Sequence, residues 1–225
     1  MKLSVSMITF QGAAYLKAQM DSIIGQSLPV HEIIVCDDGS TDGTREILAD
    51  YAAAHPQIKL QFNTENLGTV ANMQQCLRLS TGDIIFLADQ DDVWLPNKVE
   101  KTLAFFEQHP TAEAVFSNAE IIDEVGETQF GMTLWDIIGF PFGKVELTDF
   151  ETRVDNVVTG AGLAMKRDAK LLTMDIPVLP GLLHDGWIGL YFAAKNALMA
   201  NPEKLFQYRS HANQQVGGKI AERSQ

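Results

Sequence analysis

The strongest constraint on the fold is an alternation between short apolar runs and amphipathic segments in the first part of the chain. Strand-like apolar runs occur at residues 3–10, 32–36, 58–62 and 84–88. Segments with helical spacing of apolar side chains separate these runs, at residues 13–26, 44–54 and 70–79. This order predicts an α/β fold with a mostly parallel sheet and helices on both faces.

The second half of the chain has a more mixed pattern. We expect a helix from near Pro96 to Gln108, a strand at 114–116, a hairpin at 121–127 and an aperiodic, lid-like loop at 130–143. Further along, the pattern predicts a helix at 148–156, a strand at 157–166, a helix at 185–198 and a last strand at 205–209. No repeat or linker interrupts the 225 residues, which indicates one domain.

Polar loops follow three of the predicted strands. They are Thr9-Phe10-Gln11, Asp37-Asp38-Gly39-Ser40 and Asp89-Gln90-Asp91-Asp92. Parallel sheets bind ligands at the carboxyl ends of their strands, so we expect these loops to meet in one crevice. The loop at 37–42 has the composition of a strand-to-helix turn with a cap. A carboxylate fixed there could equally accept a hydrogen bond from the imide N–H of a pyrimidine.

Residues 89–92, the acidic stretch, bring three carboxylates to the end of a buried strand. Like charges this close raise one another's pKa unless a cation lies among them. Three interpretations remain open here: a divalent metal site, the acidic start of a helix, or a solvated turn. If a metal binds, hard oxygen ligands favour Mg²⁺ or Mn²⁺, which proteins often share with substrate phosphates.

A separate acid, Asp185, follows His184 just before an apolar helix. It is either the N-cap of that helix or a general base held at the helix start. His211, after the last strand, would by itself be a satisfied or solvated histidine. The run Gly160-Ala161-Gly162 does not complete a dinucleotide fingerprint, and the sequence has no Gly-x-x-x-x-Gly-Lys-Ser/Thr loop, which argues against a P-loop phosphotransferase.

Charge and cysteine content narrow the class of protein. The formal net charge of -12 argues against a nucleic-acid partner held by phosphate contacts. The two cysteines lie in apolar contexts and indicate reduced core thiols in a cytosolic protein. The first residues lack a cleavage-site pattern, and no apolar run reaches the ~18 residues needed to span a bilayer. We therefore expect a soluble protein that could still touch a membrane surface.

Taken in order, these stretches resemble family 2 glycosyltransferases with the GT-A fold. The matching segments are residues 5–10, 34–44, 66–68, 81–83, 89–94 and 184–185, within a resemblance that runs from residue 3 to about 217. The residues at positions 89–94, 184–185 and 208–213 look most like those of bacterial rhamnosyltransferase-type members. The resemblance implies a Rossmann-like, mostly parallel sheet in a single GT-A domain, with residues 1–95 as the nucleotide-sugar-binding half and 96–225 as a mixed acceptor-binding half.

The resemblance also implies a role for each matching residue. The nucleotide sugar would be held by Thr9, Phe10, Asp38, Gly68, Asn72 and Asp89. The divalent metal, Mg²⁺ or Mn²⁺, would be bound by Asp91 and His211. Asp185 would be the catalytic base, and the sugar or the acceptor would contact Asp92, Trp94, His184 and Trp187. For Asp92, capping of the following helix remains an alternative.

The implied activity is an inverting, metal-dependent sugar transfer, with rhamnose as the expected sugar. The donor would be dTDP- or UDP-linked, and the acceptor would be a hydroxyl of a glycan or a lipid-linked acceptor in bacterial surface polysaccharide synthesis. The implied location is the cytoplasm, including peripheral association with the inner face of the membrane. Two alternatives stay open: a catalytically inactive nucleotide-sugar or polysaccharide-binding relative, and a metal-dependent nucleotidyl- or phosphotransferase on a similar sheet.

Overall fold

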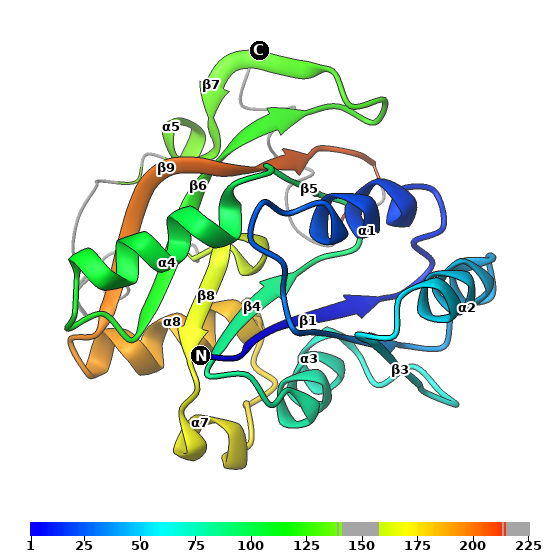
Figure 1. Ribbon diagram of the computed structural model, residues 1–225, viewed down its shortest axis with the longest axis horizontal. Helices are drawn as coiled ribbons and strands as arrows, with labels where there is room; N and C mark the ends of the chain where they lie inside the picture. The colour runs from blue at the N-terminus through cyan, green and yellow to red at the C-terminus, as the bar shows by residue number, and fades with distance from the viewer. Residues whose placement is uncertain (139, 141–157, 213, 215–225) are drawn as a thin grey trace.

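One sheet organises the part of the chain described by this computed structural model, which is residues 1–138, 140, 158–212 and 214 (Figure 1). Within that part the sheet has nine strands, in the order β3-β2-β1-β4-β8-β6-β9-β5, with β7 paired to β6. The sheet therefore runs without a break from the first half of the chain into the second.

The first half follows the predicted alternation closely. Its strands are β1 (Leu3–Thr9), β2 (Glu32–Asp37), β3 (Ile58–Phe62) and β4 (Ile84–Ala88). Its helices are α1 (Leu16–Ile24), α2 (Thr44–Ala54) and α3 (Thr69–Leu79).

The second half contains shorter and more varied elements. They are β5 (Val93–Trp94), α4 (Lys98–Gln108), β6 (Ala114–Ile122), β7 (Thr128–Thr133), α5 (Leu134–Ile138), the 3₁₀ turn η1 (Gly160–Gly162), β8 (Leu163–Lys166), α7 (Ala169–Thr173), α8 (His184–Ala194) and β9 (Leu198–Arg209).

Strands β1 to β4 form the parallel part of the sheet. β1 pairs with both β2 and β4, and β2 pairs with β3, all in parallel. Thr9 lies opposite Asp37 in this register. The predicted polar loops after β1, β2 and β4 therefore leave the sheet at the same edge, because the carboxyl ends of parallel neighbours coincide.

The rest of the sheet reverses direction at β8. β8 is antiparallel to both β4 and β6, and β9 then runs parallel to β6. β9 is the last strand of the described residues, yet it lies between β6 and β5. Val93 pairs with Gln207 and Trp94 with Phe206, so β9 holds the chain immediately after the acidic stretch.

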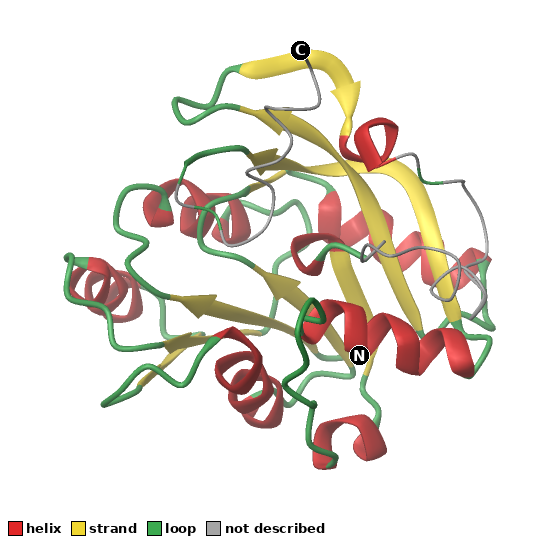
Figure 2. Ribbon diagram, turned by 180° about the vertical axis from the view of Figure 1, so that it is seen from behind, coloured by secondary structure: helices red, strands yellow, loops and turns green. Residues whose placement is uncertain are grey.

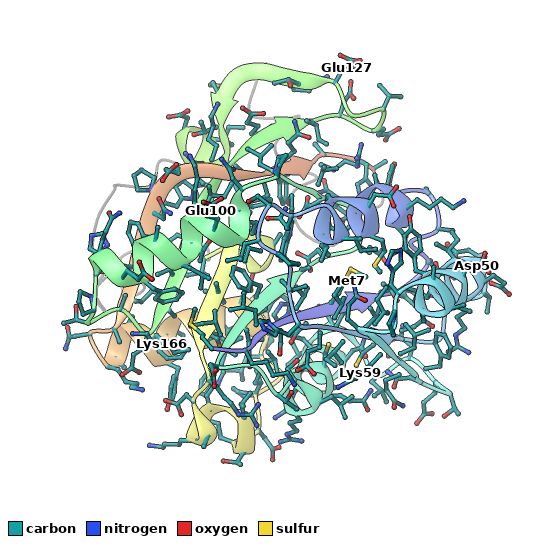
Figure 3. The ribbon with its side chains drawn as sticks, viewed as in Figure 1. Met7, Asp50, Lys59, Glu100, Glu127 and Lys166 are labelled. Atoms are coloured by element: carbon teal, nitrogen blue, oxygen red, sulfur yellow. The ribbon has the colours of Figure 1, made fainter. Side chains whose placement is uncertain are left out.

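Helices cover both faces of the sheet, as predicted. α1 and α4 lie on the near face in Figure 1, whereas α3 and α8 lie on the far face, which Figure 2 turns toward the viewer. The core lies between these layers: Met7 is fully buried in the middle of the molecule, while Asp50 and Glu127 lie at its margin (Figure 3). Among the described residues, no helix has the length and apolar character required to cross a bilayer.

Several second-half predictions were wrong. Residues 130–138 belong to β7 and α5 rather than to a loop, and the remainder of the predicted loop falls largely outside the described residues, as does the predicted helix at 148–156. The predicted strand at 157–166 begins only at Leu163, because η1 precedes it. The strand predicted at 114–116 and the first arm of the hairpin form one strand, β6.

Candidate active site

Asp37, the last residue of β2, is a buried carboxylate that joins three segments. Asp37 Oδ2 accepts a hydrogen bond from Thr9 Oγ1 at 2.9 Å, and Oδ1 accepts from the Ser40 N–H at 3.0 Å. The Arg45 guanidinium of α2 donates to Oδ1 at 2.6 Å and neutralises the charge. Asp37 thus fixes the ends of β1 and β2 against each other.

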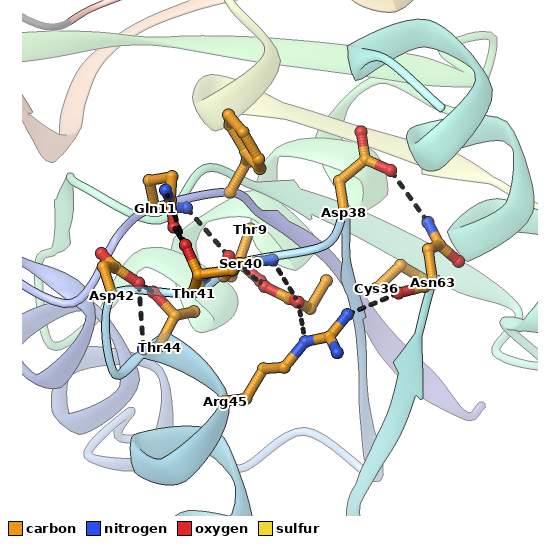
Figure 4. A network of polar contacts seen from close by, with 12 residues as sticks. Thr9, Gln11, Cys36, Asp38, Ser40, Thr41, Asp42, Thr44, Arg45 and Asn63 are labelled. Carbon is orange, nitrogen blue, oxygen red and sulfur yellow. Dashed lines mark hydrogen bonds and ion pairs between the residues drawn. The ribbon is translucent and has the colours of Figure 1, made fainter. Parts of the chain in front are cut away.

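The neighbouring carboxylate, Asp38, ties the loop after β2 to the turn before α3. Its oxygens accept hydrogen bonds from the backbone N–H groups of Leu67 at 2.8 Å and Gly68 at 2.9 Å. The Asn63 amide donates to Asp38 at 3.0 Å (Figure 4). It also donates to Asn72 Oδ1 at 2.9 Å. The structure therefore brings Asp38, Gly68 and Asn72, three of the predicted donor-binding residues, into one network.

Gln90, within the acidic stretch, joins β4 to the loop after β1. Its side-chain amide accepts from the Phe10 N–H at 2.8 Å and donates to the Phe10 carbonyl at 2.9 Å. A Cβ at Gly12 would lie 2.1 Å from Gln90 Oε1, so a larger residue there would have to displace this amide. The Phe10 ring remains 46% exposed, which leaves it accessible to a ligand.

The carboxylates of the acidic stretch occupy different environments. Burial raises the pKa of Asp89 to about 6, with further contributions from the Asp91 and Asp185 carboxylates. Asp91 Oδ2 lies 2.9 Å from His211 Nε2. Asp92 is buried and accepts the Arg209 N–H at 2.9 Å; burial, followed by the charges of Asp91 and Asp89, raises its pKa.

Asp92 does not cap the following helix. α4 begins only at Lys98, after β5, and the capping alternative is therefore wrong. The second oxygen of Asp92 has no hydrogen-bond partner within the described ranges. Whether Asp92 contacts a sugar stays a prediction.

Arg209, at the end of β9, holds the acidic stretch in place. Its Nε donates to the Asp91 carbonyl at 2.7 Å, and Nη1 donates to the Asp123 carbonyl at 3.0 Å. The guanidinium lies 4.8 Å from the centre of the Tyr15 ring, against which His211 also packs. The Arg209 side chain is buried and binds backbone carbonyls.

Asp185 comes to the site from the first turn of α8. Its Oδ2 accepts the Gly160 N–H at 3.0 Å and its Oδ1 accepts the Gly186 N–H at 2.7 Å. The preceding His184 is buried, and burial lowers its pKa. Neither ring nitrogen of His184 has a hydrogen-bond partner in the described part of the chain. A Cβ at Gly160 would lie 3.2 Å from His184 Nε2, so η1 packs closely on this pair.

The two predicted tryptophans differ in burial. Trp94 is 2% exposed, and the Lys98 ammonium lies 4.3 Å from its ring centre. Trp187 is half-buried and packs against the hydrophobic core. The indole N–H of each is buried without a hydrogen-bond partner among the residues described. Their contacts with a sugar or an acceptor stay predictions.

The predicted metal pair can be tested against the geometry. Among the described residues, no group of three or more His, Cys, Asp and Glu side chains is arranged to hold a metal ion alone. Asp91 and His211 are adjacent, however, and Mg²⁺ or Mn²⁺ commonly takes one or two protein ligands and completes its shell with water and substrate phosphate oxygens. The raised pKa values of Asp89 and Asp92 also indicate a site where a cation would relieve carboxylate repulsion. The donor set therefore fits a shared metal.

Comparison with known families places this site in context. The protein-family model described as glycosyl transferase family 2 matches residues 4–170 of the sequence. The chain belongs to glycosyl transferase family 2.

Curated relatives of this family 2 member agree with the assignment. EpsE of Bacillus subtilis (strain 168), which has a provisional glycosyltransferase name, is 39% identical over 126 residues, covering 56% of this chain and 45% of EpsE. An uncharacterized glycosyltransferase of Haemophilus influenzae is 27% identical over 219 residues, covering 94% of this chain and 66% of the relative. The chain spans about half the length of the first curated relatives that it matches.

Solved structures share the fold of this family 2 member. TarS 1-349 of S. aureus in complex with UDP-GlcNAc has a TM-score of 0.71 at 18% identity, covering 95% of this chain and 60% of that one. Mannosyltransferase PcManGT from Pyrobaculum calidifontis, in complex with GDP-Man and Mn²⁺, has a TM-score of 0.67 at 22% identity, covering 96% and 58%. The fold is GT-A, as predicted.

Sequence reasoning missed several residues that build this site. Gln90 was quoted only as part of the acidic stretch, and η1 was discounted because it lacks a dinucleotide fingerprint. Lys98 was not noticed. A signal for Lys98 was available, since it shares helical spacing with Thr102 and Phe106 and must therefore lie on the buried face of α4.

Proposed function

We propose that this family 2 member is an inverting glycosyltransferase that uses a nucleoside diphosphate sugar and takes Asp185 as its general base. One observation carries the proposal: the Asp89 pKa responds both to Asp91, from the end of β4, and to Asp185, from the start of α8. Carboxylates from two segments that are far apart in the sequence thus lie close enough to influence the same group. Such an arrangement suits a reaction in which the leaving group and the nucleophile are handled separately.

The proposed chemistry needs one proton transfer by the protein. The Asp185 carboxylate takes the proton of an acceptor hydroxyl, whose oxygen attacks the anomeric carbon from the face opposite the diphosphate. The new C–O bond forms as the bond to the diphosphate oxygen breaks, which inverts the anomeric centre. Hydrogen bonds from the Gly160 and Gly186 N–H groups orient the Asp185 carboxylate.

Asp91 and His211 are the proposed ligands of Mg²⁺ or Mn²⁺. When bound, the metal supplies positive charge beside the diphosphate leaving group. The 2.9 Å contact between the two side chains supports the pairing, as does the Mn²⁺ in the PcManGT complex.

The donor-binding residues support a nucleoside diphosphate sugar. The exposed Phe10 ring offers a face for a base, and Thr9 and Asp38 position the loops beside it. Structural neighbours were solved with UDP-GlcNAc and GDP-Man, so the fold accepts more than one nucleotide. We propose a dTDP- or UDP-linked donor with rhamnose as the sugar, and a glycan or lipid-linked acceptor in surface polysaccharide synthesis, reached from the cytoplasmic side of a membrane.

The direct test is a thermal-shift screen of dTDP-, UDP- and GDP-sugars with and without Mn²⁺. Donors that raise the Tm are then assayed for nucleoside diphosphate release and sugar transfer. Asp185→Asn should keep donor binding and lower transfer by about 10²–10⁴-fold, because it removes general-base catalysis. Asp91→Asn should remove the Mn²⁺-dependent part of the Tm shift. Asp50→Asn, at an exposed position of α2, is the matched control.

Other outcomes would redirect the assignment. Full transfer by Asp185→Asn would show that the base is wrong, and donor binding indifferent to EDTA would show that the metal pair is wrong. Donor binding without nucleoside diphosphate release would identify a binding relative without turnover. Release of pyrophosphate would identify a nucleotidyltransferase.

A further inference from the structure

Lys98 is a buried cation at the centre of the molecule. It begins α4, and its side chain is only 1% exposed. The ammonium lies 4.3 Å from the Trp94 ring centre and 4.6 Å from that of Phe206. Burial lowers the Lys98 pKa to about 7, although the Asp92 and Asp89 carboxylates oppose the shift. A charge buried this completely destabilises the fold unless hydrogen bonds and opposite charges replace its hydration.

That hydrogen bond goes to η1. Lys98 Nζ donates to the Ala161 carbonyl, inside a turn that has little room to move. A Cβ at Gly162 would lie 2.9 Å from the Ser117 carbonyl oxygen, so the turn already touches β6. The Gly162 N–H closes the turn on the Thr159 carbonyl at 3.0 Å. Lys98 therefore fixes η1 from the α4 side through a buried side-chain hydrogen bond.

The other end of η1 touches the proposed base. The Gly160 N–H donates to Asp185 Oδ2 at 3.0 Å, while His184 packs 3.2 Å from where a Gly160 Cβ would be. A continuous path of contacts thus runs from Lys98 through Ala161 and Gly160 to Asp185. Each link is a single hydrogen bond or one peptide unit.

We propose that Lys98 is a positioning residue, which holds η1 so that the Gly160 N–H orients the Asp185 carboxylate. The inference rests on the proposed role of Asp185. It assigns Lys98 no contact with substrate. Its expected effect is on kcat, because a displaced base slows the proton transfer without changing how the nucleotide is held.

The structural arm of the test does not depend on turnover. Hydrogen exchange of the peptide 158–163 is compared in the wild type, Lys98→Met and Lys101→Met. Lys101 lies on the same helix but is exposed and paired with Glu203, so it is the matched control. Lys98→Met should speed exchange of the Gly160 and Gly162 amides by about tenfold, because a hydrogen bond to a charged group is lost. Unchanged exchange would overturn the proposal.

The kinetic arm uses dTDP-rhamnose, UDP-glucose, UDP-GlcNAc and GDP-mannose as donors with Mn²⁺. Lys98→Met should lower kcat by about 10–100-fold with the donor KM within about twofold, whereas Lys101→Met should match the wild type. In an Asp185→Ala background, Lys98→Met should have almost no further effect, because both act through one group. Lys98→Arg, which keeps a cation and a donor, should recover part of the kcat.

The outcomes separate the two hypotheses. An active Asp185→Ala enzyme would overturn the base assignment, and with it the role of Lys98. An inactive Asp185→Ala enzyme beside a fully active Lys98→Met enzyme would overturn only the role of Lys98. If Lys98→Met fails to fold, Lys98→Gln, which is shorter and uncharged, replaces it in both arms and is held to the same expected results.

Discussion

The Gln90 amide occupies the space that a side chain at residue 12 would fill, and Gly12 has none. That amide forms two hydrogen bonds with the Phe10 backbone, and a Cβ at Gly12 would lie 2.1 Å from its oxygen. The flexible Gln90 side chain could withdraw only by giving up both hydrogen bonds. The position of Phe10, and with it the proposed base-binding surface, therefore depends on the lack of a Cβ at Gly12.

We expect Gly12→Ala to lower the free energy of unfolding by about 1–3 kcal/mol, because it displaces the Gln90 amide. Urea titration of four proteins measures this: the wild type, Gly12→Ala, Gln90→Ala and the double variant. In the Gln90→Ala background the same glycine substitution should cost at least about 1 kcal/mol less. Equal costs in both backgrounds would show that the two residues do not interact.

At the scale of elements, one carboxylate joins the beginnings of several strands. Glu32, at the start of β2, is buried and accepts hydrogen bonds from Ser4 at 2.6 Å, from the Thr81 N–H at 2.6 Å and from Lys59 at 2.9 Å. Burial alone would raise its pKa, but these contacts outweigh burial and hold the Glu32 pKa well below its usual range. Glu32 lies at the edge of the sheet opposite to the active site.

The pH dependence of stability follows from that shift. Because the folded-state pKa of Glu32 is lowered, its stabilisation is fully present above the unfolded-state pKa of roughly 4.3 and is lost as the pH falls further. Glu32→Gln should lower the free energy of unfolding by about 2–4 kcal/mol at pH 7, and by less near pH 3. Urea unfolding at both pH values measures the difference, with Glu107→Gln as the exposed control. A cost independent of pH would contradict this account.

How far the elements could be predicted depended on whether their cause was local. The strands and helices up to β4 follow from period and turn residues, which lie in the segment itself. β5 has only two residues and exists because Val93 and Trp94 pair with Gln207 and Phe206, far along the chain. η1 lies within a run that was predicted as a strand, and its 3₁₀ conformation comes with close packing against Ser117 and Phe206. No local pattern encodes such distant partners.

The residues of the candidate site also differ in how far the local sequence predicts them. Asp38, Asp91 and Asp185 were predicted because carboxylates at strand and helix ends stand out in a sequence. The groups that fix them, such as Arg209 and Lys98, resemble ordinary basic residues until their partners are known. The proposed roles of all these residues stay predictions, although the structure brings them to one edge of the sheet.

At the scale of the whole molecule, the sheet combines pairings of very different sequence separation. β1 and β2 are near neighbours along the chain, whereas β5 pairs with β9 across about half of it. Contacts between distant residues form more slowly, because a longer loop must close first. In pulse-labelled hydrogen exchange during refolding, we expect amides of β1 and β2 to gain protection before those of β9. Simultaneous protection would indicate a single cooperative step.

The place of β9 has a consequence for synthesis on the ribosome. Asp91 and Asp92 receive the contacts of Arg209 and His211 only when residues 198–211 have emerged. By then the strands that surround the nucleotide loops have long been available to pair, since domains fold as they leave the ribosome. In a nascent chain, the loops proposed to bind the nucleotide would therefore be nearly complete. The acidic stretch would still lack its contacts with Arg209 and His211. Premature termination before β9 would leave a protein able to fold in part but unable to order the groups on which the proposed transfer depends.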